Sequence, residues 1–208
     1  SHEGQFYRFS LINDFFNPGP IEHPDIPIYL AGVNERMCRA AGEVADGFQA
    51  HPMHSPAYIQ EVVRPELQAG AQKRGRTADD IAIHIPVFAI MGEDEAARAS
   101  NEASVRMQIA FYASTPSYRR FLEFHGFDGI GKTLSDLMRR GEIKEMPKHV
   151  PDGLLDVVAL SGNGAELGAA LKARAKAAGA TRASLYHNVK PEDDVSMWSE
   201  IAQAYKAA

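Results

Sequence analysis

Apolar residues gather in four short runs along the chain, and residues that favour turns bound each run. Short apolar runs of this kind predict strands, and the longest is rich in β-branched residues. Pro86 inside the longest run argues against a strand there, because proline lacks the N–H that a ladder needs. The predicted buried strands are Ile26–Ala31, Phe48–His51, Ile81–Met91 and Arg182–His187, and Gln5–Leu11 also alternates like a strand.

Between these runs, apolar residues recur at the spacing of one helix face. Glu35–Ala45 has small residues that allow close packing, and Asp46 and Gly47 end it. Ser55 and Pro56 give the next helix a start signal. The predicted helices are Glu35–Ala45, Ser55–Gly75, Glu95–Ser114, Tyr118–His125, Thr133–Arg140, Pro147–Val158, Ala165–Ala178 and Asp193–Ala207.

Strands and helices alternate four times, with extra helices between the third strand and the fourth. This order predicts an α/β fold with parallel strands, because parallel neighbours need long connections and helices cover the sheet. An open sheet and a barrel both fit the pattern. We find no short repeat and no low-complexity linker, so residues 1–208 are expected to form one domain or a piece of one.

Composition narrows the classes of partner and compartment. The 208 residues carry a formal net charge of -5 and no long lysine or arginine cluster, which argues against nucleic acid and anionic membranes as partners. No apolar run is long enough to span a bilayer. Cys38 is the only cysteine, so an intrachain disulfide is impossible and a cytoplasmic protein is expected.

Several segments resemble the luciferase-like monooxygenase superfamily, especially its branch that depends on the deazaflavin coenzyme F-420. The resemblance begins in IPIYLAGVNERMCRAAGEVADGFQAHPMHSPAYI and continues through EVVRPELQAGAQKRGR. FYASTPSYRRFLEFHG and SGNGAELGAALKARAKAAGATRASLYH follow in the order typical of the branch. The similarity covers nearly the whole chain, and the ordered set is more specific than any one segment.

The resemblance implies a (β/α)8 TIM barrel, which usually takes eight strands and about 250 residues. The four predicted strands correspond to family strands five to eight, so the chain is expected to be the C-terminal half of the barrel, with a helical insertion before the last strand. The N-terminal half would be absent, as in a fragment or a truncated gene product. A half-barrel that pairs with a second copy in a homo-oligomer is the alternative.

The turn Gly32, Val33 and Asn34 is the candidate cofactor site. Backbone N–H groups at a helix start favour anions, and glycine permits close approach of a phosphate. From the residues alone, a tight connection with Asn34 as N-cap is the more common interpretation; the resemblance favours the cofactor. Glu35 would disfavour a phosphate nearby. Two basic pairs, Arg119 with Arg120 and Arg139 with Arg140, are interpreted as solvated, with contact to an anionic cofactor tail as the alternative.

His51, His54 and His187 stand at strand ends and are the candidate substrate-pocket residues, because strand ends face the mouth of such a barrel. His84 lies within a strand. Imidazole also binds zinc or iron, but no paired carboxylate at ligand spacing accompanies these histidines, so no metal is expected. Hydrogen-bonded structural histidines remain an alternative.

The resemblance implies an oxidoreductase that acts on a small molecule, with hydride transfer to or from coenzyme F-420, or with FMN as the alternative cofactor. The cofactor supplies the chemistry and the protein positions it. We assign no catalytic residue from this sequence. Two other functions stay open: a non-catalytic cofactor-binding or assembly module, and a histidine–metal hydrolase on a barrel.

Overall fold

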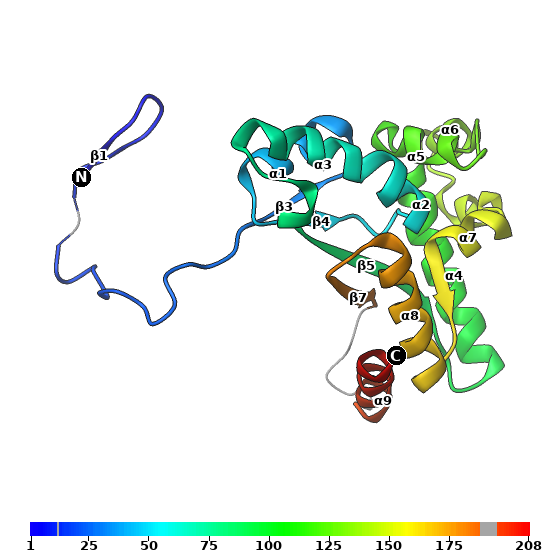
Figure 1. The fold of residues 1–208 in the computed structure, drawn as a ribbon. Helices are drawn as coiled ribbons and strands as arrows, with labels where there is room; N and C mark the ends of the chain where they lie inside the picture. The colour runs from blue at the N-terminus through cyan, green and yellow to red at the C-terminus, as the bar shows by residue number, and fades with distance from the viewer. Residues whose placement is uncertain (12, 188–194) are drawn as a thin grey trace.

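The computed structural model describes residues 1–11, 13–187 and 195–208. An N-terminal arm extends away from the body of the molecule (Figure 1). Within it, β1 (His2–Glu3) and β2 (Arg8–Phe9) pair antiparallel. The prediction of one strand over Gln5–Leu11 is therefore wrong. Gly4 N–H donates to Tyr7 O, so the segment turns back on itself instead of joining the main sheet.

The body contains a five-stranded sheet in which every pair is parallel, which confirms the α/β prediction. The central strand β5 pairs with β4 through residues 82–84, with β7 through 84–88 and with β6 through 88–90. The strands are β3 (Tyr29–Gly32), β4 (Gly47–Ala50), β5 (Ala82–Ile90), β6 (Ala159–Ser161) and β7 (Arg182–Tyr186). β6 was not predicted, because its three residues directly follow a helix.

Pro86 is accommodated within β5 because, among the described residues, one edge of this strand has no partner strand between residues 84 and 88. Residues 84 and 88 each pair with β7 on one side, so β4 and β6 must share the other edge of β5. Ala82 N–H points to that shared edge, where it donates to Asp46 O, and alternation directs the nitrogen of Pro86 the same way. This edge has no strand pair at residue 86. The missing N–H therefore costs no ladder hydrogen bond.

The strand β3 is less buried than its apolar sequence suggests. Ile26 and Ile28, which precede it, are mostly exposed, and the strand itself is largely half-buried. Among the described residues, β3 pairs only with β4 and so forms an edge of the sheet. The expectation that a strand over Ile26–Ala31 is buried is therefore wrong, although the place and direction of the strand are as predicted.

Two helices that cover the first strands pack closely against each other. Helix α1 (Glu35–Val44) lies beside α3 (Arg64–Ala71), as Figure 1 shows. A Cβ atom added at Gly42 would collide with Leu67 O, and one at Gly70 with Arg39 O, so glycine sets the distance between the helices. The single helix predicted over Ser55–Gly75 is divided into α2 (Pro56–Tyr58), a π-helical turn (Ile59–Val63), α3 and a 3-10 turn (Gln72–Arg74).

The helical segment between the third and last predicted strands is confirmed. It begins with α4 and ends with the helix that leads into β6. Its members are α4 (Glu95–Ala113), a 3-10 turn (Pro116–Tyr118), α5 (Arg119–Phe124), α6 (Ile130–Arg139), a 3-10 segment (Ile143–His149) and α7 (Asp152–Val158). A further 3-10 turn, Ala78–Asp80, leads into β5.

Two helices complete the described fold. Helix α8 (Gly164–Ala178) packs against α9 (Ser196–Ala207), where Gly168 approaches Ile201 O. The predicted start of the last helix at Asp193 lies outside the described residues. No helix in the described ranges is both long and apolar enough to cross a membrane. Side chains alternate along β5, so Ile83, Ile85 and Val87 are buried in the core while His84 lies on the opposite face.

Candidate functional site

The predicted cofactor turn connects β3 directly to α1. Asn34 occupies the N-cap position with extended backbone, and its carbonyl accepts the N–H groups of Met37 and Cys38. Its side chain makes no capping hydrogen bond. A Cβ atom at Gly32 would stand 3.0 Å from Met37 Cβ and from the Phe48 ring, so glycine is needed for this close packing. The turn therefore has the compact form that the sequence predicts.

The negative charge at the start of α1 has a partner. Glu35 forms an ion pair with Arg120, and their side chains are 46% and 45% exposed respectively. Arg120 belongs to α5, which the fold brings to the start of α1 from a distant part of the sequence. The expected repulsion between Glu35 and an anion is thus offset, and a guanidinium group stands at the helix start.

A cavity of about 320 Å³ adjoins this turn, and we call it the strand-end cavity. Gly32 and Val33 line it together with His51, so the structure brings these predicted residues to one place. Asn34 does not line it. Its remaining walls come from neighbouring strands and include Gln49, His84, Pro86, Ser184 and Tyr186.

Three of these side chains form a hydrogen-bonded row across β4, β5 and β7. His84 Nδ1 lies 2.5 Å from Gln49 Oε1, and His84 Nε2 lies 3.0 Å from Ser184 Oγ. Gln49 Nε2 donates to Ala50 O at 3.3 Å, which places the amide oxygen toward the imidazole. Burial, and after it the charge of Arg182, lowers the pKa of His84.

His51 is a neutral hydrogen-bond donor in this cavity. Met53 N–H donates to His51 Nδ1 at 3.1 Å, so the ring hydrogen of neutral His51 is on Nε2. Burial lowers the pKa of His51 to about 4. Its ring contacts Tyr112 at 4.4 Å and Tyr118 at 4.8 Å between centroids. Two aromatic residues of the helical segment therefore pack against this histidine.

His54 lies behind the site. It is 2% exposed, and its Nδ1 donates to His51 O at 2.9 Å. Burial lowers the pKa of His54 to about 3. Within the described ranges, His54 Nε2 and the Tyr58 hydroxyl have no hydrogen-bond partner, and both residues line a small inner cavity beneath Gly32 and Val33. His54 thus supports the turn from inside.

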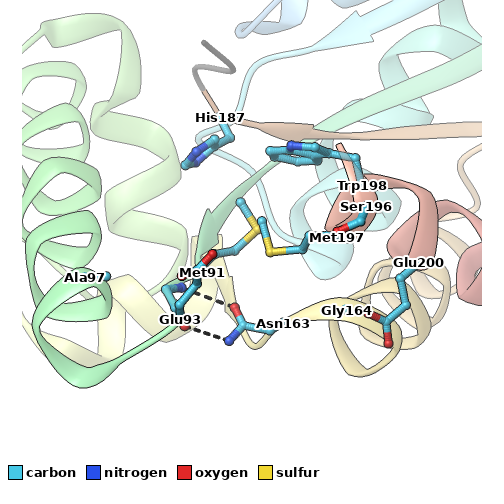
Figure 2. Close-up of a pocket in the computed structure, with 11 residues that line it drawn as sticks. Met91, Glu93, Ala97, Asn163, Gly164, His187, Ser196, Met197, Trp198 and Glu200 are labelled. Atoms are coloured by element: carbon cyan, nitrogen blue, oxygen red, sulfur yellow. Dashed lines mark hydrogen bonds between the residues drawn. The ribbon is translucent and has the colours of Figure 1, made fainter. Parts of the chain in front are cut away.

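His187 lies at a different cavity, of about 490 Å³, between β5, α8 and α9. Figure 2 shows His187 beside Trp198, with Met91 and Met197 below them. The ring centroids of His187 and Trp198 are 5.5 Å apart. Asn163 joins the start of α8 to the segment after β5. Its Oδ1 accepts from Gly92 N–H at 3.2 Å, and its Nδ2 donates to Gly92 O at 2.7 Å.

The start of α8 also borders this second cavity. Ala165 N–H donates to Glu200 Oε1 at 3.3 Å, so a carboxylate from α9 already occupies part of this helix start. The two helix starts therefore differ in charge. At α1 the carboxylate of Glu35 is paired with the guanidinium of Arg120, whereas at α8 the carboxylate of Glu200 accepts from a backbone N–H.

Sequence reasoning missed Gln49, Ser184 and Tyr186, and it noted His84 only as a strand residue. The alternation within β4, β5 and β7 could have indicated them, since residues two apart share a face. Cys38 is buried, and burial raises the pKa of its thiol to about 12, so it is no nucleophile. In the parts of the chain that the structure covers, no group of three or more His, Cys, Asp or Glu side chains could hold a metal ion.

The comparisons with known proteins agree with this architecture. An uncharacterised protein of Mycobacterium tuberculosis is 36% identical over 83% of this chain and 51% of its own length. The 5,10-methylenetetrahydromethanopterin reductase of Archaeoglobus fulgidus is 26% identical over 77% of this chain and 47% of its own. The chain thus spans about half the length of these curated relatives.

Solved structures share the fold. An F-420-dependent secondary alcohol dehydrogenase in complex with an F-420–acetone adduct superimposes with a TM-score of 0.60 at 16% identity. That likeness covers 98% of this chain and 55% of the dehydrogenase. The sequence model of the luciferase-like monooxygenase family matches residues 1–182. This chain belongs to the luciferase-like monooxygenase family.

Proposed function

We propose that the chain is part of an oxidoreductase that uses coenzyme F-420 to oxidise or reduce a small molecule. The observation that carries the proposal is the pairing of Glu35 with Arg120 at the start of α1. The pair neutralises Glu35 and places guanidinium N–H donors close to the N–H groups of a helix start, and both kinds of donor suit a phosphate. An F-420-dependent glucose-6-phosphate dehydrogenase of Nakamurella multipartita, 29% identical over 38% of this chain, supports this choice. FMN, which also carries a phosphate, is the alternative.

The turn residues would act through their backbone. Gly32, Val33 and Asn34 would hold the phosphate with their N–H groups, beside the Glu35–Arg120 pair. The bound deazaflavin would accept or donate a hydride. His51, neutral and carrying its hydrogen on Nε2, would offer a donor to a substrate in the strand-end cavity. His54 would hold the carbonyl of His51 and support the turn.

We also propose that the chain supplies strands five to eight of a (β/α)8 barrel. The parallel sheet and the half-length match to the relatives support this. The first four strand–helix units would then come from a separate N-terminal half, with a second copy of this chain as the alternative. A non-catalytic cofactor-binding module is the rival function, and the same half-length match favours it.

Ligand titration tests the phosphate site. We expect F-420 to bind roughly tenfold tighter than the phosphate-free deazaflavin riboside, because charge-assisted hydrogen bonds to a phosphate are strong. Arg120→Ala should remove most of this difference. Arg119→Ala is the matched control on the same helix and should leave it unchanged. Equal binding of the two deazaflavins by the unaltered chain would contradict the assignment of the turn.

A turnover assay distinguishes the proposed oxidoreductase from a non-catalytic cofactor-binding module. Reduced and oxidised F-420 differ in absorbance, so the chain can be assayed for cofactor reduction with alcohols as probe substrates, alone and mixed with the N-terminal half of a family member. Reduction in the mixture supports the oxidoreductase. Tight F-420 binding without reduction in either preparation favours the module.

A further inference from the structure

The row Gln49–His84–Ser184 has a defined direction of hydrogen bonding. Ala50 O can only accept, so Gln49 uses its amide nitrogen there and presents Oε1 to His84. Oε1 can only accept in turn, which places the ring hydrogen of His84 on Nδ1. Neutral His84 then has its lone pair on Nε2, where the Ser184 hydroxyl donates at 3.0 Å.

This is the arrangement of an activated nucleophile: a hydroxyl, a base within hydrogen-bond reach, and a third group that orients the base. We propose that Ser184, His84 and Gln49 form a serine nucleophile site that cleaves small uncharged esters without a redox cofactor. All three side chains line the strand-end cavity, so a substrate there meets the hydroxyl directly. The chemistry needs neither a phosphate tail nor hydride transfer, although it shares the strand-end cavity with the substrate of the proposed oxidoreductase.

The shape and lining of the cavity indicate the substrate class. Its volume of about 320 Å³ is at the lower end of small-molecule pockets. Ala31, Val33, Ala50 and Pro86 supply apolar walls, which suit a short acyl chain. His51 lines the same cavity with its hydrogen on Nε2, and in the proposed site this N–H would donate to the ester carbonyl oxygen.

The reaction balances with water as the second reactant. Ser184 Oγ forms a bond to the acyl carbon while its proton moves to His84 Nε2, and the alcohol leaves with that proton. Water then gives a proton to His84 Nε2 and its hydroxide to the acyl carbon. The bond from the acyl carbon to Ser184 Oγ breaks, His84 returns its proton to Oγ, and the free acid leaves. Gln49 fixes the ring orientation, but it is neutral and does not stabilise the imidazolium as a carboxylate would, so turnover is slow. Arg182 opposes the imidazolium further.

Covalent labelling tests the nucleophile on the chain as it stands. A fluorophosphonate probe should add once per chain, and peptide mass spectrometry should locate the adduct on Ser184. His84→Ala should slow labelling about 100-fold, since a positioned base contributes that much or more. Ser117→Ala, at an exposed serine in another element, is the matched control and should label like the unaltered chain.

Gln49→Glu distinguishes catalysis from a merely structural hydrogen-bond row. A carboxylate beside Nδ1 stabilises the imidazolium, so hydrolysis of p-nitrophenyl acetate should rise about tenfold or more. A structural role predicts no such gain. Circular dichroism would confirm that each variant is folded. Absence of a Ser184 adduct on the folded, unaltered chain would overturn the proposal, and so would labelling that is indifferent to His84; neither result would bear on F-420 binding.

Discussion

His51 and His54 show how strongly local environment decides side-chain chemistry. His51 and His54 are three residues apart, yet each has a different tautomer, set by one backbone hydrogen bond. His51 receives an N–H and keeps its hydrogen on Nε2, whereas His54 donates from Nδ1. A sequence shows that both are histidines at a strand end, but it does not show which nitrogen can donate.

The lowered pKa of His51 predicts a pH dependence of stability. Between the ordinary value of 6.5 and the folded value of about 4, the unfolded state binds more protons than the folded state. The free energy of unfolding should therefore be fully retained above pH 6.5 and fall as the pH drops toward 4. Urea titrations at pH 7, 5.5 and 4.5 measure this slope, and His51→Gln should make it shallower.

Proton NMR gives the direct check of the same histidine. The ring resonance that disappears in His51→Gln should titrate near pH 4 in the folded chain. A midpoint near 6.5 would contradict the effect ascribed to the burial of His51.

At the residue scale, part of the site was predictable. Gly32, Val33 and His51 line one cavity, as the strand-end argument suggested. The row through His84 was not predictable, because its hydrogen bonds join residues 35 and 100 positions apart in the sequence. Strand register decides that juxtaposition, and no local pattern encodes the register between distant strands.

At the scale of elements, the packing of α1 against α3 depends on two glycines. Backbone carbonyls of the facing helix occupy the places where their Cβ atoms would lie. Interhelical contact this close fixes the turn of Gly32, Val33 and Asn34, since α1 begins directly after it. The fit of two elements thus determines the position of the candidate site.

Gly42→Ala and Gly70→Ala should each lower the free energy of unfolding by about 1–3 kcal/mol, because an added methyl group forces the helices apart. Gly153→Ala in α7 is the matched control: its Cβ would meet only the Phe127 ring, at 3.6 Å. That change should be neutral or stabilising, since alanine favours helix over glycine. Urea unfolding compares the three variants, and equal stabilities would refute the role given to Gly42 and Gly70.

The elements were predicted best where an apolar pattern was long enough. The four predicted strands and most helices exist, with ends displaced by a few residues. β6 and the π-helical turn were missed because three and five residues give no recognisable period. Pro86 lowered the support for β5, and only the arrangement of its neighbours explains why proline is tolerated there.

At the scale of the whole molecule, the short strand β6 pairs only with β5 within the described ranges, and β3 and β7 are the outer members of the order β3, β4, β5, β7. Among the described residues, β3 pairs only with β4, and β7 pairs only with β5. Alternation of strands and helices predicted the parallel sheet, because parallel neighbours require crossovers. Closure into a barrel depends on which strands pair with β3 and β7. The hydrophobic pattern of this sequence does not encode those partners.

Mixing experiments test the proposed barrel. We expect the chain, 22.8 kDa, to form a one-to-one complex with the first four strand–helix units of a family member, because pairing would satisfy both outer strands. Light scattering after size exclusion measures the mass. A stable dimer of the chain alone would support the second-copy alternative. If the chain stays monomeric and does not bind the added N-terminal half, both models of barrel closure are contradicted.

The buried position of Cys38 has a practical consequence for all these measurements. Its thiol is the only one in the chain, it is 1% exposed, and its raised pKa keeps it protonated at neutral pH. The thiolate is the form that reacts with maleimide. The native chain should therefore be unreactive toward maleimide, and Cys38 should react only when α1 detaches. The molecule therefore carries an intrinsic probe of its own opening, in the helix that follows the proposed phosphate turn.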